Sequence, residues 1–215
     1  MKRKGMKKSA RSLEGTENEN HASFLARFEL KVTPDELLYL DMAYDFSKRA
    51  HEKQWRETGA RYFEHARGTV IILVDELGIT DVGLAIASIF HDCPEDTWLM
   101  TLTRIRLIFG ERVARIDAAV TKPKDDDPRF RSKAAAKRWY YANIKASDVD
   151  VKLVKLVDRL QNTRALVACS REKQLRKIAE TRKYILPLIP DVAKVYPRVA
   201  KLLTQKFAEA IAALA

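Results

Sequence analysis

The residues best suited to chemistry lie in one short segment, residues 90–97. It contains one imidazole and three carboxylates within six residues: His91, Asp92, Glu95 and Asp96. The segment directly follows an apolar run, residues 84–90, that is typical of a buried element. Charged side chains at the end of a buried element are costly to desolvate unless they meet a partner or a metal ion. The pattern therefore predicts a polar site that residues elsewhere in the chain complete.

Two other positions carry side chains that suit such a site. His65 is predicted to lie one turn into a helix among apolar neighbours. Taken alone, a histidine there is more often a hydrogen-bonded core residue than a metal ligand. Asp158 interrupts a strongly apolar helix, and the alternative to a metal is a salt bridge with Arg159 or Arg164. Two imidazoles and two carboxylates suit Mn²⁺, Fe²⁺ or Zn²⁺ better than Mg²⁺. The candidate metal ligands are His65, His91, Asp92 and Asp158.

Glu95 and Asp96 follow one turn after His91 and Asp92. This spacing lets their carboxylates face the same cavity without binding the metal. A group that orients or deprotonates an attacking water would stand there. The alternative for both residues is a solvated acidic turn. Glu95 and Asp96 are therefore the candidate catalytic residues.

The remaining histidines and the cysteines indicate no second site. His21 lies in a polar N-terminal stretch, and His51 is expected to be a solvated surface residue near a helix end. Cys93 is expected to be a small filler that faces away from the candidate site, and the alternative is a thiolate ligand or nucleophile beside His91 and Asp92. Two cysteines, Cys93 and Cys169, do not make a disulfide framework, so a reducing cytoplasmic location is expected.

The composition indicates a soluble globular protein. The chain has 215 residues, of which 47% are hydrophobic and 32% are charged. No run of about 18 apolar residues occurs, so no membrane span is expected. The formal net charge is +11, and six positive charges lie in residues 2–11 without any acid. Residues 1–22 are predicted to form a disordered basic tail, for which nucleic-acid binding is the less favoured role, and the basic remainder suits a polyanionic small-molecule substrate.

The elements that must position these side chains are predicted to be helices. Thr33 and Glu36 form a capping box with a proline at the first helical position. Gly78 and Gly110 mark helix ends, and no alternating run of strand length occurs. Residues 23–215 are therefore predicted to form one all-α domain of roughly eight to ten helices. The predicted helices span residues 34–53, 62–77, 80–92, 99–109, 112–120, 132–145, 148–168, 171–186 and 192–214.

The order and context of these motifs resemble one enzyme family. The four candidate ligands match, in order, the pattern of the HD metal-dependent phosphohydrolases. The surrounding sequence is similar to the hydrolase domain of the RelA/SpoT alarmone enzymes and their stand-alone small forms. The resemblance extends over about residues 33–190. The segments that carry it are residues 50–59, 62–65, 90–97, 109–113, 120–122 and 153–164.

The resemblance implies an all-α HD-domain helical bundle that binds Mn²⁺ through the four candidate ligands, with other divalent metals as alternatives. It implies removal of the 3′-diphosphate from guanosine 3′,5′-bis(diphosphate), or from its pentaphosphate, with release of pyrophosphate. Glu95 and Asp96 would orient or activate the attacking water. The implied substrate contacts are Arg56 at the base, Asn162 at the nucleoside, and Lys133 and Arg138 at the phosphates. Because the chain ends soon after Asp158, no synthetase domain is expected.

One position departs from the family pattern. Glu57 follows Arg56 where the family usually has a second basic residue in the base pocket. A carboxylate cannot donate a hydrogen bond to the O6 atom of guanine, but it can accept one from the amino group of adenine. Glu57 is therefore a candidate substrate-binding residue that relaxes the base preference or shifts it toward adenosine nucleotides. The alternative is an outward-pointing side chain with no effect.

Two other functions are compatible with the same residues. Another HD phosphohydrolase would act on nucleoside 5′-phosphates or on the 2′-phosphate of a nicotinamide cofactor (NADPH), and would release orthophosphate. A non-catalytic nucleotide-binding module would use the pocket without turnover, but the presence of all four ligands together with Glu95 and Asp96 argues against it. The sequence predicts no oligomeric state.

Overall fold

The structure, a computed structural model, describes residues 19–214, and the regular elements of this part are all helical. Among these residues the strand-like pairing is limited to one isolated bridge between Trp55 and Arg61. The prediction of an all-α fold is confirmed. No helix within residues 19–214 is both long enough and apolar enough to cross a membrane.

The N-terminal part contains a helix that the sequence did not predict. α1 (His21–Ala26) begins at a capping box. Phe24 and, just after the helix, Phe28 are buried to 1% and 0% exposure. The end of the predicted tail, residues 1–22, therefore belongs to the fold, because two phenylalanines anchor the helix on the core. Residues 1–18, where the rest of this prediction falls, lie outside the described residues.

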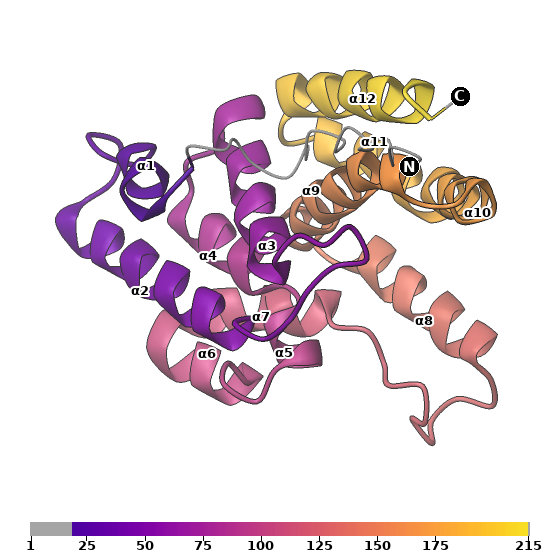
Figure 1. Ribbon diagram of the computed structural model, residues 1–215, viewed down its shortest axis with the longest axis horizontal. Helices are drawn as coiled ribbons and strands as arrows, with labels where there is room; N and C mark the ends of the chain where they lie inside the picture. Colours follow the sequence, from indigo (N-terminus) through magenta and orange to yellow (C-terminus); the bar gives the residue numbers. More distant parts are fainter. Residues whose placement is uncertain (1–18, 215) are drawn as a thin grey trace, which may run out of the picture.

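Four helices build the centre of the molecule. α2 (Pro34–Ala50) packs on α4 (Val82–Phe90), and α3 (Tyr62–Ile71) contacts both α4 and α9 (Val149–Ala165). In Figure 1 α9 lies between α3 and the C-terminal helices, and most of its side chains are buried. α9 therefore forms a central helix that packs against α3, α4 and further helices that precede and follow it in the chain, and it buries charged side chains among its apolar ones.

The local signals for helix ends are confirmed. At the start of α2 the Thr33 hydroxyl accepts a hydrogen bond from the Glu36 N–H, and the Glu36 carboxylate accepts one from the Thr33 N–H. α3 continues through a π-helical turn (Ile72–Glu76) and stops before Gly78. The φ of Gly78 is 72°, a left-handed conformation that favours glycine.

Four further helices lie along the lower side of Figure 1. α5 (Cys93–Asp96) is a single turn that directly follows α4. α6 (Leu102–Phe109) and α7 (Glu111–Val120) form a helical hairpin, and α7 packs against α4 and α9. A loop of residues 121–132 then leads to α8 (Lys133–Ala146), which contacts α9.

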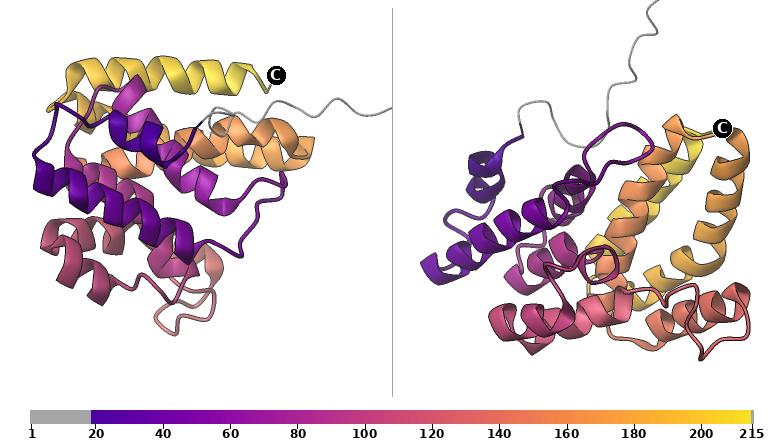
Figure 2. Two further views of the ribbon diagram at one scale, coloured as in Figure 1. Left: turned by 60° about the vertical axis from the view of Figure 1, so that its left-hand side comes forward. Right: turned by 60° about the horizontal axis from the view of Figure 1, so that its bottom comes forward.

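The C-terminal elements follow α9 without a long connection. They are a 3₁₀ turn (Leu166–Ala168), α10 (Arg171–Glu180), a π turn (Thr181–Ile185), a 3₁₀ turn (Leu186–Leu188), α11 (Ile189–Ala193) and α12 (Pro197–Ala212). The prediction of one helix over residues 192–214 is wrong, because the chain breaks after α11 and α12 restarts at Pro197. Proline has no N–H and is tolerated in the first turn of a helix but not in its interior. Figure 1 and the left view of Figure 2 show α12 along the outer edge of the bundle, where it packs against α9.

Candidate active site

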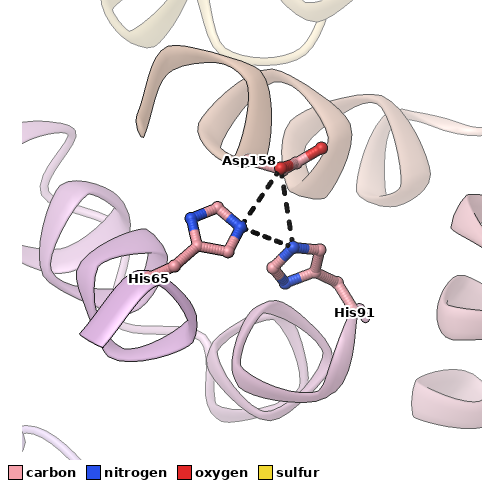
Figure 3. A group of neighbouring side chains, drawn as sticks. All are labelled: His65, His91 and Asp158. Carbon is pink, nitrogen blue, oxygen red and sulfur yellow. Dashed lines mark hydrogen bonds and ion pairs between the residues drawn. The ribbon is translucent and has the colours of Figure 1, made fainter. Parts of the chain in front are cut away.

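Three helices bring one cluster of buried side chains together. His65 comes from α3, His91 follows the last residue of α4, and Asp158 comes from α9. The Nε2 atoms of the two imidazoles lie 3.1 Å apart, and each lies 3.5 Å from the Oδ1 atom of Asp158. Figure 3 shows the three side chains pointing at one another from separate helices. Three of the predicted ligands therefore meet in a group that can hold a metal ion.

Asp92 is the fourth member of the cluster. Its Oδ2 atom lies 3.1 Å from the Nε2 atom of His91 and 3.5 Å from the Nε2 atom of His65. The side chain of Asp92 is 14% exposed, which makes it the most accessible of the four. All four predicted ligands thus present two nitrogens and two carboxylate oxygens to a common space.

The second nitrogen of each imidazole sets the tautomer of the ring. The Nδ1 atom of His91 lies 2.8 Å from the carbonyl oxygen of Ser88, and the Nδ1 atom of His65 lies 3.0 Å from the Oε1 atom of Gln161. Both partners are acceptors, so both Nδ1 atoms carry the proton and both Nε2 atoms present lone pairs. Two such lone pairs beside two carboxylates repel one another unless a proton or a metal ion lies among them. The donor set fits a divalent metal, whose histidine ligands are commonly oriented by such hydrogen bonds.

The electrostatics of the cluster also favour a cation. Burial by itself would lower the pKa of His91, but the carboxylates of Asp92 and Asp158 outweigh it and raise this pKa well above its usual range. Burial would raise the pKa of Asp158, but the Lys155 ammonium and the two imidazoles outweigh it and hold the pKa well below its usual range. The pKa of Asp92 is lowered in the same way, against burial, chiefly by His91. The cluster therefore contains two ionised carboxylates that attract positive charge.

Neighbouring side chains hold these two carboxylates in place. Buried Lys155 donates from Nζ to the Oδ2 atom of Asp158 at 2.7 Å, and the Asn162 amide donates to the Oδ1 atom. The Tyr62 hydroxyl donates to the Oδ2 atom of Asp92 at 2.7 Å. Each carboxylate is thus fixed by a hydrogen bond from outside the cluster, which preorganises it for a ligand role.

The two predicted catalytic carboxylates lie in α5, beside the cluster. The Tyr62 hydroxyl lies 3.3 Å from the Oδ2 atom of Asp96 and also contacts Asp92. Glu95 accepts hydrogen bonds from the Lys122 ammonium at 3.2 and 3.3 Å. Burial, together with the negative charges of Asp92 and Glu95, raises the pKa of Asp96. Asp96 is therefore the better placed of the two to exchange a proton, whereas Glu95 is ion-paired.

A cavity of about 390 Å³ runs from Asp92 and Asp158 toward the surface loop of residues 51–61. Successive turns of α9 and its extension line this first cavity through Asn162 and Leu166. The loop lines it with four consecutive residues, 55–58. A ligand of nucleotide size can therefore reach the cluster with one end and the loop with the other.

A second cavity of about 480 Å³ adjoins the first, and basic residues outnumber acidic ones in its lining. Lys122, Arg159 and Lys177 line both cavities. Lys133 and Lys137, from α8, line the second cavity. The two adjoining cavities together offer space and positive charge for a polyanionic ligand.

Comparison with known proteins identifies the family of this fold and cluster. The family model described as the HD domain matches residues 43–188, a range that includes all four predicted ligands. The chain belongs to the HD-domain family. The resemblance on which the sequence prediction rested is therefore confirmed.

Relatives of this HD domain include proteins with named activities. The human guanosine-3′,5′-bis(diphosphate) 3′-pyrophosphohydrolase MESH1 is 38% identical over 132 residues, which cover 60% of this chain and 70% of the human protein. The guanosine-3′,5′-bis(diphosphate) 3′-pyrophosphohydrolase of Aquifex aeolicus is 36% identical over 149 residues, which cover 69% of this chain and 21% of that protein. A solved structure described as a metazoan orthologue of SpoT that hydrolyses ppGpp matches with a TM-score of 0.65 and 22% identity, over 80% of this chain and 94% of that one. This structural likeness confirms the fold.

Two predicted substrate contacts meet at the outer end of the first cavity. Arg56 donates from Nη2 to the Oδ1 atom of Asn162 at 2.7 Å, and both residues line the first cavity. Glu57 lines the same cavity, and its carboxylate pairs with the Lys173 ammonium at 2.5 Å. Glu57 is 76% exposed, yet it is engaged by a specific partner.

The two residues predicted to contact phosphates differ in position on α8. Lys133 lines the second cavity and pairs with Asp125. Arg138 is exposed and lies outside the residues that line the two cavities. Lys137, one helical turn from Lys133, lines the second cavity instead. The placement of α8 therefore favours Lys137 over Arg138 as a phosphate contact.

The prediction that His51 is a surface residue is wrong. His51 is 1% exposed, its Nδ1 atom lies 2.6 Å from the Oε1 atom of Gln54, and its ring stacks on Tyr62 at 4.8 Å between centroids. Its Nε2 atom lies 3.3 Å from the sulfur of Cys93, which is buried as predicted. The charged neighbours in the sequence suggested solvent, but the loop that follows His51 folds over it. His51 thus supports the tyrosine that orients Asp92.

Several cavity residues of the HD domain were not predicted. Lys155 precedes Asp158 by three residues, a spacing that places both on one face of a helix and was available in the sequence. Tyr62 and Lys122 were not singled out, and Arg159 was considered only as an ion-pair partner of Asp158, which pairs with Lys155 instead. The relation of these residues to the cavities depends on contacts between distant helices and loops. Arg159 is held by Glu180 at 2.7 Å and faces both cavities.

Proposed function

We propose that this chain is a metal-dependent hydrolase that removes the 3′-diphosphate from guanosine 3′,5′-bis(diphosphate) and related alarmone nucleotides and releases pyrophosphate. The observation that carries the proposal is a set of two imidazole nitrogens and two carboxylate oxygens at the end of a cavity with cationic walls. The names of the human and Aquifex relatives support the same activity.

The proposed metal ligands are His65, His91, Asp92 and Asp158. We propose Mn²⁺ as the ion, because mixed nitrogen and oxygen donors suit it, with Fe²⁺ and Zn²⁺ as alternatives. A divalent ion bound there supplies Lewis-acid polarisation of a phosphoryl oxygen and activation of water. Supporting this role, both imidazoles are held in the tautomer that exposes Nε2.

The remaining residues of the site have separate roles in the proposal. Asp96, with its raised pKa, accepts the proton of the attacking water, and Glu95 orients that water while its own carboxylate is held by Lys122. Lys122 and Arg159, which line both cavities, stabilise the charge on the departing pyrophosphate. Arg56 lies against the base.

The substrate is proposed to be a small nucleotide and not a nucleic acid, because the cavities are pockets of a few hundred Å³ lined by basic side chains. A cytoplasmic location is part of the proposal and is supported by the free thiols of Cys93 and Cys169. Residues 23–215 are proposed to act as one domain.

The proposal is tested by incubating the purified chain with Mn²⁺ and a panel of guanosine and adenosine nucleotides that carry 3′-diphosphates. Pyrophosphate and the matching nucleoside 5′-phosphate are the expected products, measured by ion-exchange chromatography. The panel also includes NADPH and nucleoside 5′-monophosphates, and release of orthophosphate from these alone would favour the other phosphohydrolase function. His91→Ala should abolish turnover. Absence of turnover with every 3′-diphosphate would overturn the proposal.

A further inference from the structure

The outer end of the first cavity contains an ion pair that the proposed reaction does not use. Figures 1 and 2 both show the loop of residues 51–61 reaching across to the junction of α9 and α10. Glu57 on this loop pairs with Lys173 on α10, and both residues line the cavity. Their side chains are 76% and 29% exposed, so their polar atoms are accessible to a ligand in the cavity.

The wall between the cluster and this ion pair suits a nucleoside. Asp158, Asn162 and Leu166 lie one turn apart along α9 and its extension, and all three line the cavity. At a rise of 1.5 Å per residue, Leu166 lies about 12 Å from Asp158 along the helix axis. A nucleotide whose 3′-phosphate lies at the cluster, with its ribose near Asn162, therefore places its base near Leu166 and the exposed indole of Trp55. Indole and aliphatic surfaces bind bases by stacking and apolar contact.

The Glu57–Lys173 pair then offers one acceptor beside one donor at the edge of that base. The hydrogen bond and charge of Lys173 lower the pKa of Glu57, so this side chain is a carboxylate and only accepts. The Lys173 ammonium only donates. Guanine presents the acceptor O6 beside the donor N1–H, whereas adenine presents the donor 6-amino group beside the acceptor N1. The two purines therefore need the carboxylate and the ammonium in opposite order.

We propose that Glu57 and Lys173 together read the edge of the purine base, and that their order in space decides between guanine and adenine. The inference rests on the proposed hydrolase function. It makes Lys173 a specificity residue, although no sequence motif indicated it. It also explains how a carboxylate at residue 57 is compatible with either purine, because a donor lies directly beside it.

The test is the charge-swapped double variant Glu57→Lys with Lys173→Glu, which keeps an ion pair but reverses its order. The measured quantity is the ratio of kcat/KM for guanosine 3′,5′-bis(diphosphate) to kcat/KM for its adenosine counterpart. The swap should move this ratio about tenfold in the direction opposite to the wild-type preference. The single variants Glu57→Gln and Lys173→Met should each bring the ratio closer to one. The first removes the carboxylate that only accepts, and the second removes the ammonium that donates.

A matched control is the swap Arg106→Glu with Glu111→Arg, which reverses an exposed ion pair away from both cavities. This control should leave the ratio unchanged. Binding of GDP and ADP by titration calorimetry provides a second readout for a variant with slow turnover, and the swap should reverse the order of the two affinities. The inference would be overturned if the swap and both single variants kept the wild-type ratio of kcat/KM and the wild-type order of affinities for GDP and ADP. That outcome would leave the hydrolase function intact. Absence of wild-type turnover with both purines would instead overturn the function and the inference together.

Discussion

His65 and His91 face each other through their Nε2 atoms at 3.1 Å, while their Nδ1 atoms lie within hydrogen-bond distance of Gln161 and Ser88. Neither ring can turn its lone pair away without losing a buried hydrogen bond. The cluster therefore needs positive charge between the two rings, which either a proton on His91 or a metal ion can supply. This relationship links metal binding to the stability of the whole fold, since the two rings are held by α3 and α4.

Binding of Mn²⁺ should stabilise the protein. At a free concentration 100 times the dissociation constant, a ligand that binds only the folded state adds about 2.7 kcal/mol to the free energy of unfolding. The melting temperature of chelator-treated protein should rise on addition of Mn²⁺, as measured by calorimetry. His91→Ala should lose this rise, whereas His21→Ala, which changes a histidine far from the cluster, should keep it. An equal rise in His91→Ala would contradict the assignment of the ligands.

Gln161→Met should weaken Mn²⁺ binding although Gln161 is not a proposed ligand. The substitution keeps the length of the side chain but removes the acceptor for the Nδ1 proton of His65. Loss of such an orienting partner typically costs about 10–100-fold in metal affinity. Titration calorimetry with Mn²⁺ gives the dissociation constant, and Gln205→Met on the exposed side of α12 is the matched control. An unchanged constant would show that His65 needs no orientation by Gln161.

Asp117→Val should stabilise the protein, and more so at high pH. Asp117 is fully buried in α7, and neither carboxylate oxygen has a hydrogen-bond partner within the described part of the chain. Burial raises the pKa of Asp117 well above its usual range. The unfolded carboxyl ionises near pH 4, so above that pH the unfolded state binds fewer protons than the folded state and stability falls as pH rises.

Removing this carboxyl should add roughly 1–3 kcal/mol to the free energy of unfolding at pH 8, with a smaller gain near pH 4. Urea unfolding between these pH values, with a chelator present, measures the difference. Asp126→Asn in the exposed loop is the control and should have no such effect. A loss of stability in Asp117→Val at all pH values would show that Asp117 has a stabilising partner.

Glu180→Gln should destabilise the protein at neutral pH. Burial opposes ionisation of Glu180, but hydrogen bonds and charges from Lys137 and Arg159 outweigh it and lower its pKa to about 2. The unfolded carboxyl has a pKa near 4.3, so the stabilisation is complete above about pH 5 and is lost as pH falls toward 2.

The loss in Glu180→Gln should be roughly 2 kcal/mol at pH 7, allowing for partial solvent screening, and should shrink as pH falls from 5 to 3. Denaturant unfolding at several pH values provides the measurement. If the difference in free energy of unfolding between the wild type and Glu180→Gln stayed constant across this pH range, the charge of Glu180 would not be the cause of the destabilisation. Because Glu180 also holds Arg159, the variant should raise the KM for the substrate as well.

Lys133→Met and Arg138→Met should differ in their effect on turnover. Lys133 lines the second cavity and Arg138 does not, so only the first substitution removes a positive charge from the proposed phosphate region. Lys133→Met should lower kcat/KM by roughly fivefold at low salt and by less at high salt. Arg138→Met should change it by less than about twofold. The opposite order would support the sequence-based assignment of Arg138.

Local interactions made much of the helical architecture predictable. Capping groups and helix-ending glycines act within a few residues, so the start of α2, the stop of the α3 segment before Gly78 and the end of α6 at Gly110 follow directly from the sequence. The two errors in the predicted helices, the missing α1 and the unbroken C-terminal helix, also have local causes. α1 is too short to show a periodicity, and Pro197 was not recognised as the start of a new helix.

The chemical identity of the candidate site was also readable from the sequence, because only a few imidazoles and carboxylates interrupt otherwise apolar helices. Only the tertiary structure decided which of them meet. It brought His65, His91 and Asp158 within 3.5 Å of one another, buried His51 under the following loop and turned Lys137 toward the cavity. It also placed Lys173 against Glu57, 116 residues away in the sequence. Such distances depend on how helices pack and how loops fold back over them, and periodicity within one helix carries no information about either.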